Sequence, residues 1–147
     1  MGYYNSILVA IDLTAESDHL INKAFSFASD EFSRIEIIHT IEPLSVSYSI
    51  DAPMDFSAVQ DQVQELAKHH MKMLGDKYNI KKEYRHLLFG RTQTEVQRVS
   101  QEIKADLIVV GTHDRHELSF LLSSRADGIM RTADCDVLAV HIQEKDI

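Results

Sequence analysis

The chain has 147 residues, of which 44% are hydrophobic and 26% are charged, and its formal net charge at pH 7 is −8. This length suits one domain spanning residues 1–147, and the composition is that of an ordinary globular protein. The acidic balance argues against nucleic acid as the main partner, because binding to phosphates requires a basic face.

Two further features of the sequence favour the cytoplasm. The apolar runs are too short to span a membrane, and Asp12 interrupts the first of them, so we expect neither a membrane segment nor a signal peptide. Cys135 is the single cysteine, which excludes a disulfide within the chain and fits a reducing compartment.

Short apolar runs rich in β-branched residues alternate along the chain with segments of helical spacing. The runs predict buried strands at residues 7–11, 35–41, 84–89, 107–110 and 137–140. After the first strand, Thr14 or Ser17 can cap a helix by accepting a backbone N–H at its first turn. The alternation predicts an α/β fold, with a single doubly wound, mainly parallel, five-stranded sheet and helices on both faces.

The second predicted helix follows a long connection. Residues 42–56 contain both prolines, and a connection of this length inside a compact domain is usually functional or mobile. Apolar residues then recur at helical spacing, and Gly75 is expected near the last turn. His70 lies on this stripe, so we expect it to be partly buried. The stripe consists of Val59, Val63, Leu66, His70, Met73 and Leu74.

The candidate site lies in the stretch 105–142, which has the pattern of strand, loop, helix and strand. Gly111 is expected to stop the strand, a polar loop follows, and helical spacing returns from Leu118. Open α/β folds bind ligands where such a loop leads from the carboxyl end of a parallel strand into a helix. The function therefore depends on what residues 111–125 can hold.

Several motifs of catalytic and nucleotide-binding sites are absent from the sequence. No G-x-G-x-x-G follows the first strand, and neither a G-x-x-x-x-G-K-[ST] loop nor a G-x-S-x-G elbow occurs. Asp12 stands nearly alone at the strand ends, whereas a receiver domain phosphorylated on aspartate needs an acidic cluster there. We therefore expect no catalysis.

The polar loop contains two histidines that are candidate metal ligands. His113 and His116 could supply two ligands, with Asp114 or Asp12 as a third, but a metal site needs three or four ligands that converge. A polar loop with exposed imidazoles beside Arg115 explains the same residues, so we expect no metal.

Three segments carry a resemblance to a known family. ILVAIDLT with a following ES (7–17), ADLIVVGTH (105–113) and CDVLAVHI (135–142) resemble the universal stress protein family in order and spacing. The resemblance spans nearly the whole chain. It implies a small cytoplasmic protein of the adenine nucleotide alpha-hydrolase-like, Rossmann-like fold, which accumulates under starvation and other stresses and usually dimerises.

One large branch of that family binds ATP or related adenine nucleotides through G-x2-G-x9-G-[ST] after the fourth strand. Glycines let backbone N–H groups approach the phosphates, and a helix N-terminus adds a favourable dipole. In this sequence Asp12 matches the residue that contacts adenine and Gly111 matches the first glycine. The candidate pocket consists of Asp12, Ile41, Gly111, Asp114, Ser124 and Arg125.

Three positions of the pocket depart from the motif. Asp114 brings a carboxylate where a phosphate would lie, and like charges in a confined site repel by a few kcal/mol at an effective dielectric of about 20. Ser124 adds a Cβ where the backbone should approach closely. Arg125 could pair with a phosphate or could simply be a solvated helix charge. The stretch L-S-S-R (122–125) resembles the branch typified by universal stress protein A, for which ATP binding is not expected.

Two functions remain open from the sequence. The first is a stress-response protein without catalysis or cofactor, acting through an unidentified protein partner. The second is a sensor of ATP or AMP with a degenerate phosphate loop. For either, the resemblance implies a homodimer in which the last strands pair antiparallel, although that strand could instead be buried inside the subunit's own sheet. The interface residues would be Val137, Leu138, Ala139, Val140 and His141.

Overall fold

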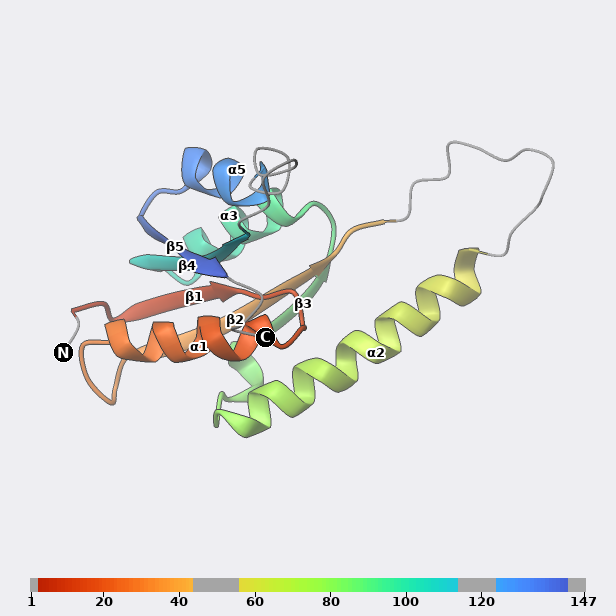
Figure 1. Cartoon of the computed structure of the whole chain (residues 1–147), viewed down its shortest axis with the longest axis horizontal. Coiled ribbons are helices and arrows are strands. Elements are labelled where there is room, and N and C mark those ends of the chain that lie inside the picture. The colour runs from red at the N-terminus through yellow and green to blue at the C-terminus, as the bar shows by residue number, and fades with distance from the viewer. Residues whose placement is uncertain (1–2, 44–55, 114–123, 143–147) are drawn as a thin grey trace.

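The computed structural model describes residues 3–43, 56–113 and 124–142, and it confirms the α/β prediction (Figure 1). Helices alternate with strands along the chain, and a short 3-10 helix precedes the third strand. The elements are β1 (Ser6–Ala10), α1 (Glu16–Phe27), β2 (Arg34–Ile41), α2 (Phe56–Lys77), η1 (Lys82–Tyr84), β3 (Arg85–Phe89), α3 (Thr92–Glu102), β4 (Leu107–His113), α5 (Ser124–Thr132) and β5 (Asp136–Ile142).

The five strands form one sheet in the order β3-β2-β1-β4-β5, and each pairing between neighbours is parallel. Strand β1 is at the centre, paired with β2 on one side and β4 on the other. Its first residues are also fixed by a side chain, because the two carboxylate oxygens of Asp106 accept hydrogen bonds from the backbone N–H groups of Asn5 and Ser6, each at 2.9 Å. The chain reverses its direction of winding at β1, which creates the switch point of the sheet.

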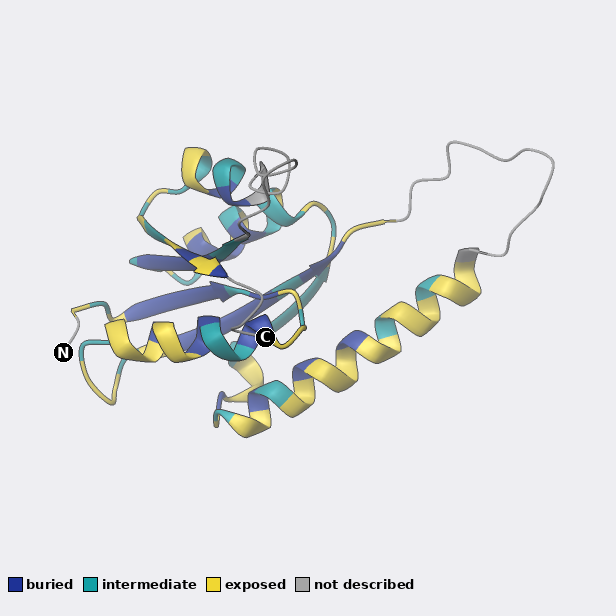
Figure 2. Cartoon of the chain, viewed as in Figure 1, coloured by how far each residue is buried: buried dark blue, intermediate teal, exposed yellow. Residues whose placement is uncertain are grey.

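Each face of the sheet is covered by two helices, so the central strands are buried on both sides (Figure 2). Ile7 and Val9 of β1 point toward α1 and α2, whereas Leu8 between them points toward α3 and α5. Each such fully buried side chain contributes about 1.5–3 kcal/mol relative to an exposed one. This explains why the apolar runs of the sequence are continuous instead of alternating.

The orientation predicted for the second helix is wrong for the whole stripe except Leu74, which is partly buried against the core. Val59, Val63, Leu66 and Met73 are 38%, 41%, 59% and 57% exposed, and His70 is exposed as well. The side chains that α2 buries belong to the neighbouring face, which includes Ala67, Met71 and Gly75. We call the exposed set the outer stripe. It consists of Val59, Val63, Leu66, His70 and Met73.

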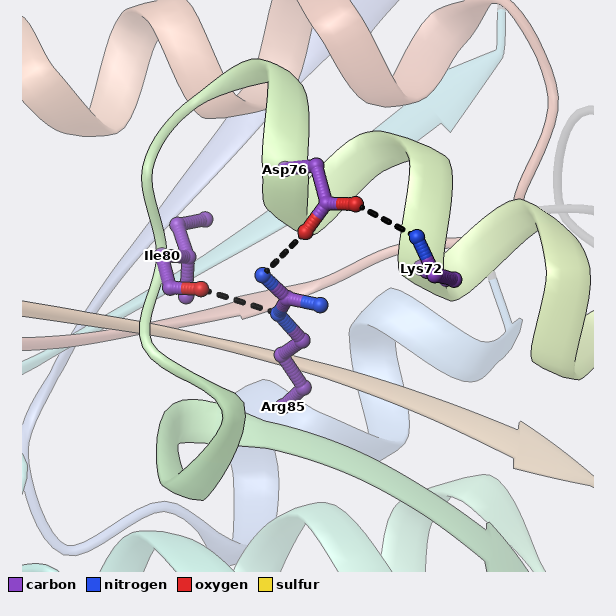
Figure 3. A network of polar contacts seen from close by, with 4 residues as sticks. All are labelled: Lys72, Asp76, Ile80 and Arg85. Atoms are coloured by element: carbon purple, nitrogen blue, oxygen red, sulfur yellow. Dashed lines mark hydrogen bonds and ion pairs between the residues drawn. The ribbon is translucent and has the colours of Figure 1, made fainter.

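Only the last part of α2 is attached to the sheet, and the amino-terminal part projects away from it (Figure 1). Arg85 contributes to the attachment: its Nε donates to the carbonyl oxygen of Ile80 at 2.8 Å and its Nη2 donates to Asp76 at 2.9 Å (Figure 3). Lys72 bonds the other oxygen of Asp76, and these two cations hold the pKa of the Asp76 carboxyl below its ordinary value. The Arg85 side chain lies against Gly75, where a Cβ atom would overlap its guanidinium group.

Each strand differs by one to three residues at one or both ends from the sequence prediction, and the end of α2 lies two residues beyond Gly75. The helix continues past Gly75 to Lys77 and ends where Asn79 adopts a φ of 55°, with the N–H of Ile80 bonded to the Gly75 carbonyl. Strand β4 does not stop at Gly111, since its pairing with β5 continues to His113. Among the residues that the structure describes, no helix has both the length and the apolar character to cross a bilayer.

Replacing Arg85 by alanine should lower the free energy of unfolding by about 1–3 kcal/mol, because the Ile80 carbonyl loses a charged donor. Gly75→Ala should be more costly in the wild type than in the Arg85→Ala background, where the added methyl group has room and alanine favours the helix by about 1 kcal/mol. Urea denaturation of the four proteins measures this coupling. Lys72→Ala is the control and should cost less than about 1 kcal/mol, because its ion pair is exposed. An equal effect of Gly75→Ala in both backgrounds would contradict the packing described.

Candidate functional site

The structure brings three of the predicted pocket residues to the same end of the sheet, at the switch point. Asp12 follows β1, Ile41 is the last residue of β2, and Gly111 lies in the carboxyl-terminal half of β4. Because the strands are parallel, these carboxyl ends share one edge, as the sequence predicts.

Asp12 organises the start of α1. Its Oδ1 accepts hydrogen bonds from the backbone N–H of Thr14 at 3.1 Å and from the Thr14 hydroxyl at 2.7 Å. The Thr14 oxygen in turn accepts from the N–H of Glu16, the first residue of the helix, at 3.3 Å. Between them Leu13 has a φ of 63°, in the left-handed region. The carboxylate therefore holds a tight turn. Thr14 accepts a backbone N–H of the first turn, as predicted, but the N-cap residue is Ala15, which forms no side-chain cap.

Gly111 allows close packing between three elements. A Cβ atom at this position would lie 3.3 Å from Cγ1 of Ile142 and 3.5 Å from both δ carbons of Leu20. Because glycine has no Cβ atom, side chains of α1 and β5 can pack closely against β4 at this point. These neighbours are apolar, and a Cβ atom would be tight against Ile142 and in ordinary contact with Leu20, so packing favours glycine here.

Two residues of β2 belong to this end of the sheet and were missed by the sequence analysis. The Nδ1 of His39 lies 2.8 Å from the carbonyl oxygen of Ile11, and since a carbonyl can only accept, Nδ1 carries the hydrogen. Thr40 is buried, and within the described part of the chain its hydroxyl has no hydrogen-bond partner. The sequence does contain a signal for this pair, because His39 and Thr40 are two polar residues near the end of an otherwise apolar strand.

Comparison with known proteins agrees with this arrangement. A sequence model of the universal stress protein family matches residues 3–141. The chain belongs to the universal stress protein family. It is 34% identical over 143 residues to universal stress protein A homolog 1 of Coxiella burnetii (strain RSA 493 / Nine Mile phase I), a match that covers 97% of this chain and 99% of that one.

Solved structures agree with the fold of this universal stress protein. The hypothetical protein MJ0577 superimposes with a TM-score of 0.76 at 17% identity, covering 96% of this chain and 98% of its own. A universal stress protein in complex with cAMP superimposes with a TM-score of 0.66 at 19% identity, covering 94% and 97% of the two chains. At these identities the likeness concerns the fold alone.

The phosphate side of the predicted pocket is only partly described. Asp114 lies outside the described residues, and so does His116. Ser124 and Arg125 form the beginning of α5, but their side chains, like that of His113, are also outside the described part. Within the described part, no three His, Cys, Asp or Glu side chains gather as a metal site would require.

Beside Asp12 a cleft separates the start of α1 from the last turns of α2, and we call it the α1–α2 cleft. Its volume is about 350 Å³. On one side it meets two residues of the outer stripe, His70 and Met73. The lining residues are Leu13, Thr14, Ala15, Asp18, His70, Met73, Leu74 and Lys77.

The closed end of the cleft is held by a charged cluster. Asp18 Oδ1 accepts hydrogen bonds from Lys77 Nζ at 2.6 Å and from the Tyr78 hydroxyl at 2.5 Å. Partial burial opposes ionisation of Asp18, but the bonds from Lys77 and Tyr78 outweigh it and lower the pKa of the carboxyl. Burial and the same carboxylate raise the pKa of Tyr78. The cluster therefore joins α1 to the end of α2.

The predicted interface strand β5 lies at an edge of the sheet. Among the described residues it pairs with β4 alone, so burial inside the subunit's own sheet does not apply there. Val140 is buried, Val137 and Leu138 are half-buried, and Ala139 and His141 are exposed. An edge of this kind presents backbone N–H and C=O groups to another chain.

The Asp18 cluster should make stability depend on acid pH. Because the pKa of folded Asp18 is below the ordinary value of 3.8, its contribution is present above that pH and is lost as the pH falls through the folded pKa. Thermal unfolding between about pH 2 and 6 should therefore show a smaller loss of Tm on acidification for Asp18→Asn than for the wild type. Asp61→Asn, exposed on the projecting part of α2, is the charge-matched control. Parallel pH profiles for the wild type and Asp18→Asn would contradict the assignment.

Proposed function

We propose that this universal stress protein acts without catalysis, as a homodimer joined through β5, and does not hold ATP. The observation that carries the proposal is the position of β5 at an edge of the sheet, where it pairs with β4 alone among the described residues. Asp12 is already engaged through Oδ1, which accepts two hydrogen bonds from Thr14, at 2.7 and 3.1 Å. An adenine contact at Asp12 would therefore be restricted to Oδ2.

The phosphate side supports the same proposal from the sequence. Asp114 adds a negative charge and Ser124 a Cβ at positions where an ATP site of this family has glycine. Repulsion between a carboxylate and a phosphate is worth a few kcal/mol in a partly screened site. Each 1.4 kcal/mol weakens binding tenfold, so a few kcal/mol would weaken ATP binding by about a hundredfold to a thousandfold.

The homodimer is supported by the position of β5. Antiparallel pairing of two copies about a twofold axis would continue the sheet from one subunit into the next and satisfy the edge groups. Of the five residues predicted for it, Ala139 and His141 are exposed, Val137 and Leu138 are half-buried, and Val140 is buried.

The remaining features fit a cytoplasmic interaction protein that binds an unidentified protein partner and no nucleic acid. The charge of −8 disfavours nucleic acid. Burial raises the pKa of the Cys135 thiol, with the carboxylates of Asp106, Asp136 and Asp134 acting in the same direction. A thiol of this kind is mostly protonated at neutral pH, which argues against a nucleophile.

The alternative is an adenine nucleotide sensor with a degenerate phosphate loop. Two observations favour it. A protein of the same fold has been solved in complex with cAMP. Arg125 also lies in the first turn of α5, and a helix N-terminus favours an anion. In this alternative ATP, AMP or a related nucleotide would lie across β1 and β4, with Asp12 near the base.

The test uses protein purified without added ligand. The protein is denatured, released adenine nucleotide is sought by mass spectrometry, and fresh protein is titrated by calorimetry with Mg-ATP, AMP and cAMP. We expect no released nucleotide and no heat at millimolar ligand. Stoichiometric release or saturable heat would overturn the non-binding proposal, and Arg125→Ala and Asp12→Asn should then each weaken that binding.

The β5 interface is tested by the mass of the assembly in light scattering at micromolar concentration. Ala139→Glu should halve the mass, because two exposed methyl groups near the twofold axis would be replaced by two like charges. Mixing Ala139→Glu with Ala139→Lys should restore the larger mass, since the charges then attract. A wild-type protein that is monomeric under these conditions would contradict the homodimer.

A further inference from the structure

A second cavity opens at the amino-terminal end of the sheet, opposite the end that carries Asp12 and Gly111. Its volume is about 410 Å³. Strand β2 starts at Arg34, but its pairing with β3 begins only at Ile37. Among the described residues, no strand therefore pairs with β2 on that side at Ile35, and the cavity lies between the segment that precedes β2 and the segment that precedes β3. We call this cavity the aromatic pocket.

Aromatic rings line both walls of the aromatic pocket. The wall before β2 carries Phe25 and Phe32, and the wall before β3 carries Tyr78 and Tyr84. The rings of Phe25 and Tyr78 stack on each other, with their centroids 6.3 Å apart. Phe32 is 83% exposed, and within the described part of the chain no ring stacks on it. An apolar ring that lies in water beside a cavity can be covered by a ring of a ligand.

The two walls also carry charges of opposite sign. Glu31 is on the wall before β2, and Lys81 is on the wall before β3, with its Nζ 5.8 Å from the centroid of the Tyr84 ring. Both residues are exposed, and neither side chain has an ion-pair or hydrogen-bond partner among the described residues. Arg34, the third charged residue of the lining, donates to the carbonyl oxygen of Ile103 at 3.0 Å. The charges available to a ligand are therefore one carboxylate and one ammonium.

Both walls are fixed by hydrogen bonds of the chain itself. Before β2, the hydroxyl of Ser33 accepts a hydrogen bond from the backbone N–H of Ser29 at 3.1 Å. Before β3, the backbone turns at Asn79, which has a φ of 55°, and the N–H of Ile80 bonds the Gly75 carbonyl at 2.8 Å. A pocket whose walls are already ordered loses little conformational entropy when a ligand binds.

We propose that the aromatic pocket binds a small aromatic zwitterion, of the chemical class of the aromatic amino acids. The ring of the ligand packs against Phe32, its carboxylate pairs with Lys81, and its ammonium pairs with Glu31. The exposed ring and the two charges of the walls then each have a partner. A ligand with one charge would leave the charge of one wall unpaired. The pocket is separate from β5 and from Asp12, so it does not depend on the proposed function.

The first experiment titrates the isotope-labelled intact chain with L-phenylalanine and follows the backbone amide signals by NMR. We expect saturable shifts at the walls, for example at Ser33 and Asn79, at millimolar ligand. Phenethylamine, which lacks the carboxylate, and 3-phenylpropionate, which lacks the ammonium, should bind about two- to fivefold more weakly, because each loses one exposed ion pair. L-alanine should bind more weakly than either, because it has no ring. The absence of saturable shifts with L-phenylalanine overturns the proposal, and so does equal binding of the four compounds.

The second experiment assigns each charge of the ligand to a wall. Lys81→Gln should remove the preference for L-phenylalanine over phenethylamine, and Glu31→Gln should remove the preference over 3-phenylpropionate. The matched controls are Lys82→Gln and Glu83→Gln, because both residues are exposed in η1 and neither lines the pocket. Both control variants should keep the two preferences. Preferences that persist in the pocket variants, or that are lost equally in the controls, overturn the assignment.

Discussion

Strand β1 is the constraint on which the rest of this structure depends. Its backbone is paired on both sides, with β2 and with β4, and Leu8 and Val9 are fully buried on opposite faces. A strand in that position must be apolar throughout, and it must end where the first polar residue meets water. Asp12 occupies that point. The same topology leaves the carboxyl ends of β2 and β4 on either side of it, so the switch point of the sheet is formed by the central strand.

Asp12 consequently has a structural role before any functional one. In this chain its carboxylate supports the turn into α1 through Thr14, and α1 in turn packs Leu20 against Gly111. A ligand that engaged Asp12 through its other oxygen, Oδ2, would therefore bind the same carboxylate that positions the helix beside the pocket. This coupling explains how a member of the universal stress protein family can keep the aspartate and the glycine while the phosphate positions change.

The sequence was sufficient for the order of the elements and for the location of the pocket, because buried parallel strands need continuous apolar runs. It was insufficient where the outcome depends on contacts between residues that are distant in the sequence. Periodicity identified the residues that share a face of α2, but not which face meets the sheet. The close packing at Gly75, for example, involves Arg85, ten residues further along the chain. The sequence predicts that Gly111 stops the strand, although glycine is tolerated in a strand where side chains from both neighbouring elements approach closely. His39 was missed because its partner, the Ile11 carbonyl, lies just after another strand, β1.

The attachment of α2 at one end has a consequence for how such a chain can vary. Arg85 and the Asp18 cluster bond the last turns of the helix, and Met71 packs in the core. Among the described residues, the projecting turns make no contribution to the core clusters on either face of the sheet. Adding or removing one heptad in the projecting part would therefore change the length of the projection by about 10 Å and keep its apolar stripe in phase. The reach of the helix is thus adjustable by insertion and deletion without a change in the core.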